Sequence, residues 1–281
     1  MLERELDEAA SLAREAGRIL LDIYATNFAV RMKGQADPVT EADTRANALL
    51  VQALRARFPG DGIVAEETAD TSDGLRAGRC WYVDPLDGTK EFVAKNGEFS
   101  VMLGLAIDGA ATLGVVYQPV GDRLYAGVVG QGATLDEAGV RTALRPTDEA
   151  DPTRLRLVVS RSHRAAEVDA LKATLGITQE AASGSVGLKV GLIARRDADL
   201  YVHLSDKASV WDTCGPEAMF RSLRNALGPH RIGGKPKVQV AMERTMACGL
   251  GACLGCVVET KHGMRTSCVD GPIYDMDEVV W

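Results

Sequence analysis

The 281-residue sequence lacks the features that mark several special classes of protein. It has no long apolar span and no secretion-type hydrophobic segment, so a cytoplasmic location without membrane association is expected. It has no internal repeat and no low-complexity tract. Positive charge is not in excess, because 32 Lys and Arg stand against 39 Asp and Glu and give a net charge of −7. This balance argues against a general nucleic-acid or anionic-membrane binder. The remaining composition, 46% hydrophobic and 25% charged, is ordinary for a globular protein of one large or two modest domains.

An acidic turn follows the short apolar run at residues 81–83. Residues of high β propensity that lead into a Pro/Gly-rich turn are typical of a strand that ends in a loop. Asp84 and Asp87 are therefore expected to leave the strand end together, with the carbonyl of Leu86 between them. Such an all-oxygen cluster suits a hard cation such as Mg²⁺. A bare pair of this spacing is more often a solvated turn, so the interpretation depends on further acidic segments.

Three further segments carry carboxylates at similar positions. Residues 62–67 begin with an apolar run and end in carboxylates, among them Glu66. Residues 37–43 include Asp43, and residues 210–213 include Asp212. Four acidic segments that converge on one edge of a fold could share metal ions. Asp43 also stands three residues after a threonine, at a capping-box spacing, so a helix-start role is an open and compatible alternative.

The order of these motifs resembles the inositol monophosphatase superfamily. The motifs are Asp-Pro-Val-Thr-Glu-Ala-Asp (37–43), Ala-Glu-Glu (65–67), Asp-Pro-Leu-Asp-Gly-Thr (84–89) and Trp-Asp-Thr (211–213). The extensions at 90–92, 96–99, 160–163 and 184–189 resemble its 3'(2'),5'-bisphosphate nucleotidase branch. The resemblance covers residues 1–213 and implies a mixed α/β fold, a layered α-β-α-β-α sandwich. The order of strand and helix patterns agrees with such a sandwich and not with a doubly wound parallel sheet.

The same resemblance implies a magnesium-dependent phosphomonoesterase. Its substrate would be 3'-phosphoadenosine 5'-phosphate or a related nucleotide or inositol phosphate. Two or three Mg²⁺ ions would be held by Glu66, Asp84, the carbonyl of Leu86, Asp87 and Asp212. Asp43 and Thr89 would orient or deprotonate the attacking water, and substrate contacts would come from Gly88, Thr89, Lys90 and Glu91.

Apolar periodicity and turn residues predict the main elements. Helices are expected at residues 2–24, 40–58, 165–175 and 184–195. Strands are expected at residues 99–107, 112–117, 123–129, 155–160 and 199–204, of which the first three form an antiparallel run.

A second signature lies in the last part of the chain, where four of the six cysteines gather. Their pattern is C-x4-C-x2-C followed by eleven residues and a fourth Cys, at positions Cys248, Cys253, Cys256 and Cys268. This matches the plant-type [2Fe-2S] spacing, while a structural zinc site is the alternative. Nearby glycines would let backbone amides approach the sulfur atoms. Cys80 and Cys214 do not fit the ligand spacing.

Residues 246–256 and 268–281, with the Cys-Gly-Pro segment at 214–216, resemble the iron-sulfur tail of the dihydroorotate dehydrogenase electron-transfer subunit. The chain thus looks like a chimera of a phosphatase domain (1–213) and a [2Fe-2S] tail (214–281), in which the tail replaces the usual C-terminal strands of the phosphatase. The alternative function is an electron-transfer protein, with a dihydroorotate dehydrogenase catalytic subunit as a candidate partner of the tail. The expected ligand is a small phosphorylated molecule, and a homodimer stays open.

Overall fold

The computed structural model describes residues 2–32, 38–68, 78–108, 110–145, 147, 149, 151–162 and 167–202, together with the backbone of six short strands between residues 231 and 275. In this part of the chain, no helix is long and apolar enough to cross a membrane.

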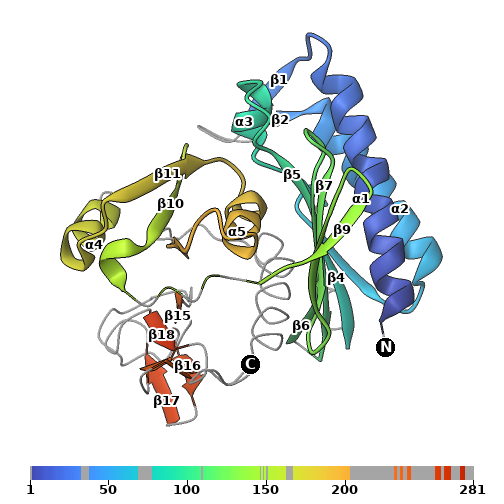
Figure 1. Cartoon of the computed structure of the whole chain (residues 1–281). Coiled ribbons are helices and arrows are strands. Elements are labelled where there is room, and N and C mark those ends of the chain that lie inside the picture. The colour runs from blue at the N-terminus through green and yellow to red at the C-terminus, as the bar shows by residue number, and fades with distance from the viewer. Residues whose placement is uncertain are drawn as a thin grey trace.

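A seven-stranded sheet forms the centre of the molecule (Figure 1). Its strands follow the chain order, and all neighbours are antiparallel except the parallel pair β3 and β4. Seven consecutive residues of β5 are buried, which shows that both faces of the sheet are covered. The strands are β3 (Gly62–Ala65), β4 (Arg79–Asp87), β5 (Ser100–Ile107), β6 (Ala110–Gln118), β7 (Arg123–Val128), β8 (Gly132–Glu137) and β9 (Val140–Ala143).

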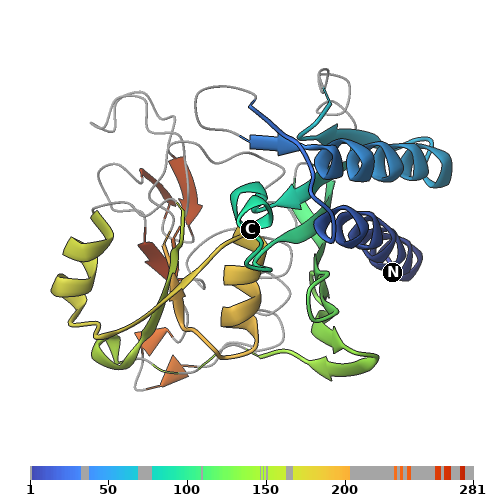
Figure 2. The same ribbon diagram turned by 90° about the horizontal axis from the view of Figure 1, so that it is seen from above.

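Two long helices, α1 (Glu3–Tyr24) and α2 (Glu41–Arg57), cover one face of this sheet (Figures 1 and 2). Both confirm the predicted helices to within a few residues. Buried α1 residues such as Leu12, Ala16 and Leu20 recur at four-residue steps and pack into the main apolar core. At the start of α2, Thr40 and Asp43 form the predicted capping box.

A smaller parallel sheet lies on the other side, in the order β11 (Gln179–Ser183), β10 (Arg156–Ser160) and β12 (Leu200–Tyr201). The helix α5 (Val186–Ala194) packs between the two sheets, with contacts to β5 and β6 on one side and to β10 and β12 on the other. The helix α4 (Glu167–Leu175) covers the far side of the smaller sheet, as seen from above in Figure 2. The succession of layers is therefore the predicted α-β-α-β-α sandwich.

Several short elements complete the description. A hairpin of β1 (Val30–Met32) and β2 (Pro38–Thr40) precedes α2, α3 (Thr89–Val93) follows β4, and a 3-10 helix spans Pro152–Arg154. The last part of the chain contains three antiparallel pairs, and none of their described strands joins either larger sheet. These pairs are β13 (Arg231–Ile232) with β14 (Lys235–Pro236), β15 (Gln239–Ala241) with β18 (Ile273–Asp275), and β16 (Val257–Thr260) with β17 (Gly263–Thr266).

Candidate active site

The acidic segment lies within the end of β4 and not in a turn after it, which corrects the expectation that the strand ends before Asp84. Asp84 pairs with Met102 of β5 and Asp87 pairs with Ser100, so three steps on β4 match two steps on β5. This irregularity is a β-bulge, which bends a strand and redirects its side chains. The bulge explains how β4 continues through a proline and still carries both carboxylates to the edge of the sheet.

Gly88 turns the chain from β4 into α3. Its φ of +95° lies in the left-handed region, and it is the residue that precedes the first turn of the helix. A Cβ atom at this position would come within 2.9 Å of the carbonyl oxygen of Glu98. A side chain is therefore excluded by both conformation and space, and Thr89 follows at a fixed position.

Thr89 and Asp43 meet at the start of α2. The Thr89 hydroxyl lies 3.1 Å from Asp43 Oδ1 and 3.2 Å from the Leu86 carbonyl oxygen, so its single proton has two alternative acceptors. Asp43 Oδ2 accepts hydrogen bonds from the amide and the hydroxyl of Thr40, both at 2.7 Å. Burial raises the pKa of Asp43, although these hydrogen bonds oppose the shift. The structure thus joins three of the residues that the sequence singled out.

Asp87 connects the large sheet to α5. Its Oδ1 accepts a hydrogen bond from the amide of Val186 at 3.0 Å, and its Oδ2 accepts one from the amide of Gly187 at 2.9 Å. The hydroxyl groups of Ser185 and Ser100 also donate to Oδ2. The carboxylate therefore caps the first turn of α5, where a negative charge interacts favourably with the helix dipole.

Of the remaining predicted metal ligands, Asp84 lies on β4 and Glu66 directly follows β3. Asp84 is buried and accepts a hydrogen bond from the amide of Leu86 at 3.0 Å, while the amide of Glu66 donates to the carbonyl of Val83 at 3.1 Å. Asp212 lies outside the described residues. Within those residues, no group of three or more His, Cys, Asp or Glu side chains is placed to hold a metal ion. In chemical terms, the carboxylate and carbonyl oxygens at the end of β4 suit Mg²⁺.

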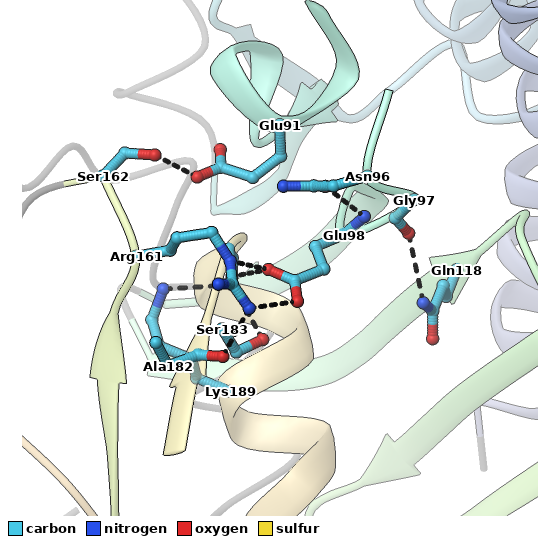
Figure 3. A network of polar contacts seen from close by, with 11 residues as sticks. Glu91, Asn96, Gly97, Glu98, Gln118, Arg161, Ser162, Ala182, Ser183 and Lys189 are labelled. Carbon is cyan, nitrogen blue, oxygen red and sulfur yellow. Dashed lines mark hydrogen bonds and ion pairs between the residues drawn. The ribbon is translucent and has the colours of Figure 1, made fainter. Parts of the chain in front are cut away.

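Beyond the strand end, a polar network links the large sheet to the smaller one (Figure 3). Glu91 of α3 is buried and accepts a hydrogen bond from the hydroxyl of Ser162. Glu98 forms a two-pronged ion pair with Arg161, at 2.7 and 2.6 Å. The sequence motifs at 160–163 and 184–189 contain several of these residues, but the long-range pairing of Glu98 was missed.

Lys189 is the buried cation of this network, and its side chain is 3% exposed. Its ammonium group donates to the carbonyl of Gly184 at 3.2 Å and lies over the ring of Tyr201. Burial lowers the pKa of Lys189, while the carboxylates of Asp87, Glu91 and Glu98 oppose that shift. Among the predicted substrate contacts, Lys90 lies beside Glu91 on α3 and is half-buried.

A layered sandwich with buried carboxylates at a bulged strand end offers the oxygen ligands that a metal-dependent enzyme requires. The sequence model of the inositol monophosphatase family matches residues 1–223. The 3'(2'),5'-bisphosphate nucleotidase CysQ of Escherichia coli (strain K12) is 36% identical over 217 residues, which cover 76% of this chain and 86% of that protein. The chain therefore belongs to the inositol monophosphatase family and is a phosphatase.

Solved structures agree with this assignment. The crystal structure of CysQ from Bacteroides thetaiotaomicron has a TM-score of 0.66 and 28% identity, and the match covers 79% of this chain and 88% of that one. The suhB protein of Bartonella henselae has a TM-score of 0.70 and 24% identity, and the match covers 79% of this chain and 85% of that one. At this identity the likeness supports the fold alone. Residues 243–280 are separately similar to the iron-sulfur cluster binding domain of dihydroorotate dehydrogenase B.

Proposed function

We propose that this phosphatase is a magnesium-dependent 3'(2'),5'-bisphosphate nucleotidase. Its substrate is 3'-phosphoadenosine 5'-phosphate or a related nucleotide or inositol phosphate. The arrangement of Thr89, Asp43 and the buried carboxylates at the end of β4 is the observation that carries the reaction type. The substrate class is supported by the likeness to CysQ of Escherichia coli, a 3'(2'),5'-bisphosphate nucleotidase.

In this proposal the metal ligands are Glu66, Asp84, the Leu86 carbonyl, Asp87 and Asp212. When bound, Mg²⁺ would neutralise phosphate charge and lower the pKa of an attacking water. Asp87 has capacity for this role, because Oδ1 accepts one hydrogen bond from α5 and a carboxylate oxygen has about two lone pairs. The Leu86 carbonyl is the alternative acceptor of the Thr89 hydroxyl, and it does not receive that proton when Thr89 donates to Asp43.

The proton of the attacking water would pass to Thr89 and Asp43. When the Thr89 hydroxyl donates to Asp43, its oxygen lone pairs are free to accept a proton from water. As the water attacks phosphorus, the Thr89 proton moves to Asp43 and the water proton replaces it. The ester P–O bond breaks in the same step, and its oxygen leaves as an alcohol with a proton taken from solvent. The raised pKa of Asp43 favours the proton transfer from Thr89, since a base works best when its pKa approaches the operating pH.

Substrate contacts would come from the turn after β4. Successive amides at Gly88 and Thr89 offer N–H groups of the kind that bind anions. Lys90 adds a positive charge to the same turn, and Glu91 accepts the Ser162 hydroxyl at its border with the smaller sheet. These four residues would thus hold the phosphorylated end of the substrate.

The substrate class is tested by phosphate release from 3'-phosphoadenosine 5'-phosphate, inositol 1-phosphate and histidinol phosphate, each at saturating Mg²⁺. We expect the highest kcat/KM for the nucleotide. A higher kcat/KM for either of the other two would contradict the nucleotidase assignment and leave the family intact. Histidinol phosphate is included because a histidinol-phosphatase of Chlorobaculum parvum is 36% identical over 140 residues.

We also propose that the tail, residues 214–281, binds a [2Fe-2S] cluster beside the phosphatase domain of residues 1–213. The four ligands would be Cys248, Cys253, Cys256 and Cys268, which lie outside the described residues. The similarity at residues 243–280 and the cysteine spacing support this proposal. Anaerobic reconstitution should yield about two irons per chain and a reducible chromophore. Stoichiometric zinc without iron uptake would contradict the cluster.

A dihydroorotate dehydrogenase catalytic subunit is the candidate partner of such a tail. The homodimer, the cytoplasmic location and the absence of nucleic-acid and membrane partners stay predictions from the sequence.

A further inference from the structure

Glu98 lies in the segment between α3 and β5 and receives three donors from the smaller-sheet side of the molecule (Figure 3). Arg161 Nε and Nη2 donate at 2.7 and 2.6 Å, and the amide of Gly184 donates at 2.7 Å. These partners are 63 and 86 residues away along the chain. Glu98 thus connects the segment before β5 with the residues that follow β10 and β11.

Both the amide and the carbonyl of Gly184 form hydrogen bonds with side chains. Its amide donates to Glu98, and its carbonyl accepts from the buried ammonium group of Lys189 at 3.2 Å. Its α-carbon packs tightly, because a Cβ atom there would collide with the side chain of Glu91 and would come within 2.7 Å of the Glu98 carbonyl oxygen. Gly88 approaches that same carbonyl oxygen from the α3 side. The Glu98 carbonyl oxygen is therefore in close contact with both glycines, and neither position has room for a side chain.

The position of Gly184 fixes the beginning of α5. Ser185 follows directly, with φ 47° and ψ 130°, a conformation that a non-glycine residue adopts only when its surroundings hold it. The Ser185 hydroxyl and the next two amides, of Val186 and Gly187, are the donors to Asp87. A displacement of Gly184 would therefore move three of the four groups that orient the Asp87 carboxylate.

We propose that Glu98 is a positioning residue for the phosphatase reaction. By holding the amide of Gly184, it sets the first turn of α5 against Asp87 and so fixes the carboxylate in the orientation needed for metal binding. This inference rests on the proposed role of Asp87 as a magnesium ligand. It assigns a function to a residue that lies outside the acidic motif of residues 84–89 and is not proposed to contact the reacting groups.

The test compares Glu98→Ala with two matched variants. Arg161→Gln removes the ion pair but leaves Glu98 to accept the Gly184 amide. Glu137→Gln removes a similar Glu–Arg pair, with Arg123, between β7 and β8. The readouts are the Mg²⁺ affinity from calorimetry, the Mg²⁺ concentration for half-maximal rate, and kcat and KM measured separately. Thermal melting establishes that each variant is folded.

We expect Glu98→Ala to weaken Mg²⁺ binding about tenfold, equal to about 1.4 kcal/mol, and to lower kcat more than it raises KM. Arg161→Gln should change Mg²⁺ affinity less than about threefold, because the hydrogen bond from the Gly184 amide to Glu98 is kept. Glu137→Gln should leave it unchanged. Unchanged Mg²⁺ affinity in Glu98→Ala, or an equal loss in Arg161→Gln, would overturn the proposal.

Two further outcomes are separated by design. If Glu98→Ala does not fold, Glu98→Gln retains a carbonyl oxygen for the Gly184 amide and should lie between the wild type and the expected alanine value. A full loss of about tenfold in Mg²⁺ affinity in that variant, which keeps the acceptor for the Gly184 amide, would overturn the positioning role. If the wild type binds Mg²⁺ but releases no phosphate, the proposed function fails, and the calorimetric comparison still decides whether Glu98 orients the metal ligand.

Discussion

Replacement of Thr89 by alanine removes the hydroxyl that lies between Asp43 and the Leu86 carbonyl. The fold should tolerate this change. Asp43 keeps both hydrogen bonds from Thr40 and loses one of three partners, which costs about 1 kcal/mol of stability. Alanine is a better helix former than threonine, so its helix propensity at the start of α3 should recover a few tenths of a kcal/mol of that loss.

The effect on turnover should be much larger. Without the hydroxyl, the proposed transfer from the attacking water through Thr89 to Asp43 is interrupted, so a positioned proton transfer is lost. Such a transfer contributes at least about 10² in rate, or about 2.7 kcal/mol of transition-state free energy. Thr89→Ser keeps the hydroxyl and should retain kcat to within about threefold. Mg²⁺ affinity should be similar in all three proteins, since the hydroxyl is not proposed as a metal ligand.

The assay is kcat for phosphate release at saturating Mg²⁺ across a pH series. Asp43 accepts a proton only when it is ionised, so wild-type activity should be present above its pKa and should be lost as the pH falls through it. Burial raises that pKa above the ordinary carboxyl value of 3.8. In Thr89→Ala, kcat should depend much less on pH in this acidic range. Unchanged kcat in Thr89→Ala, or a fall in Mg²⁺ affinity with kcat preserved, would refute the proton-transfer role.

Three further predictions concern other parts of the molecule. Asp199→Asn should destabilise the chain by about 2 kcal/mol in urea unfolding, because Asp199 accepts two side-chain hydrogen bonds from Arg156. Burial alone would raise the pKa of Asp199, but the hydrogen bonds from Arg156 lower it. This stability should therefore be complete above the unfolded pKa of about 3.9 and should be lost as the pH falls from there through the lower folded pKa. An Asn variant with the same acid unfolding curve would contradict this. Asp87→Asn should abolish magnesium-dependent hydrolysis, and calorimetry that gives wild-type Mg²⁺ affinity would remove Asp87 from the ligand set. Cys253→Ser should eliminate the colour of the reconstituted cluster and spare hydrolysis, whereas a joint loss of both would show that the tail completes the phosphatase fold.

Local sequence patterns predicted the elements whose stabilising contacts are also local. The amphipathic stripe of α1 and the capping box of α2 are visible in the sequence because their residues lie three or four positions apart. The strands β5, β6 and β7 were recognisable as apolar runs between turn residues. By contrast, β11 has the sequence Gln-Glu-Ala-Ala-Ser, which lacks β-branched and aromatic residues, and its place depends on parallel pairing with β10.

The site divides in the same way. The neighbourhood of Asp43, Thr89 and Leu86 followed from recognisable motifs, and the structure joins them by hydrogen bonds. The bulge that keeps Asp84 and Asp87 inside β4 depends on register with β5, which a single segment does not reveal. The pairing of Glu98 with Gly184 is a contact between distant segments of two sheets. No periodicity or spacing rule predicts such a contact.

The central claim, that the carboxylates at the end of β4 hold the magnesium on which phosphate hydrolysis depends, is tested most directly by one titration. The initial rate of phosphate release from 3'-phosphoadenosine 5'-phosphate is measured against free Mg²⁺ in the intact chain and in Asp84→Asn. We predict no release in EDTA, saturable release with added Mg²⁺ in the wild type, and loss of that release in the variant. Release that persists in EDTA, or a wild-type magnesium response in Asp84→Asn, would contradict the claim.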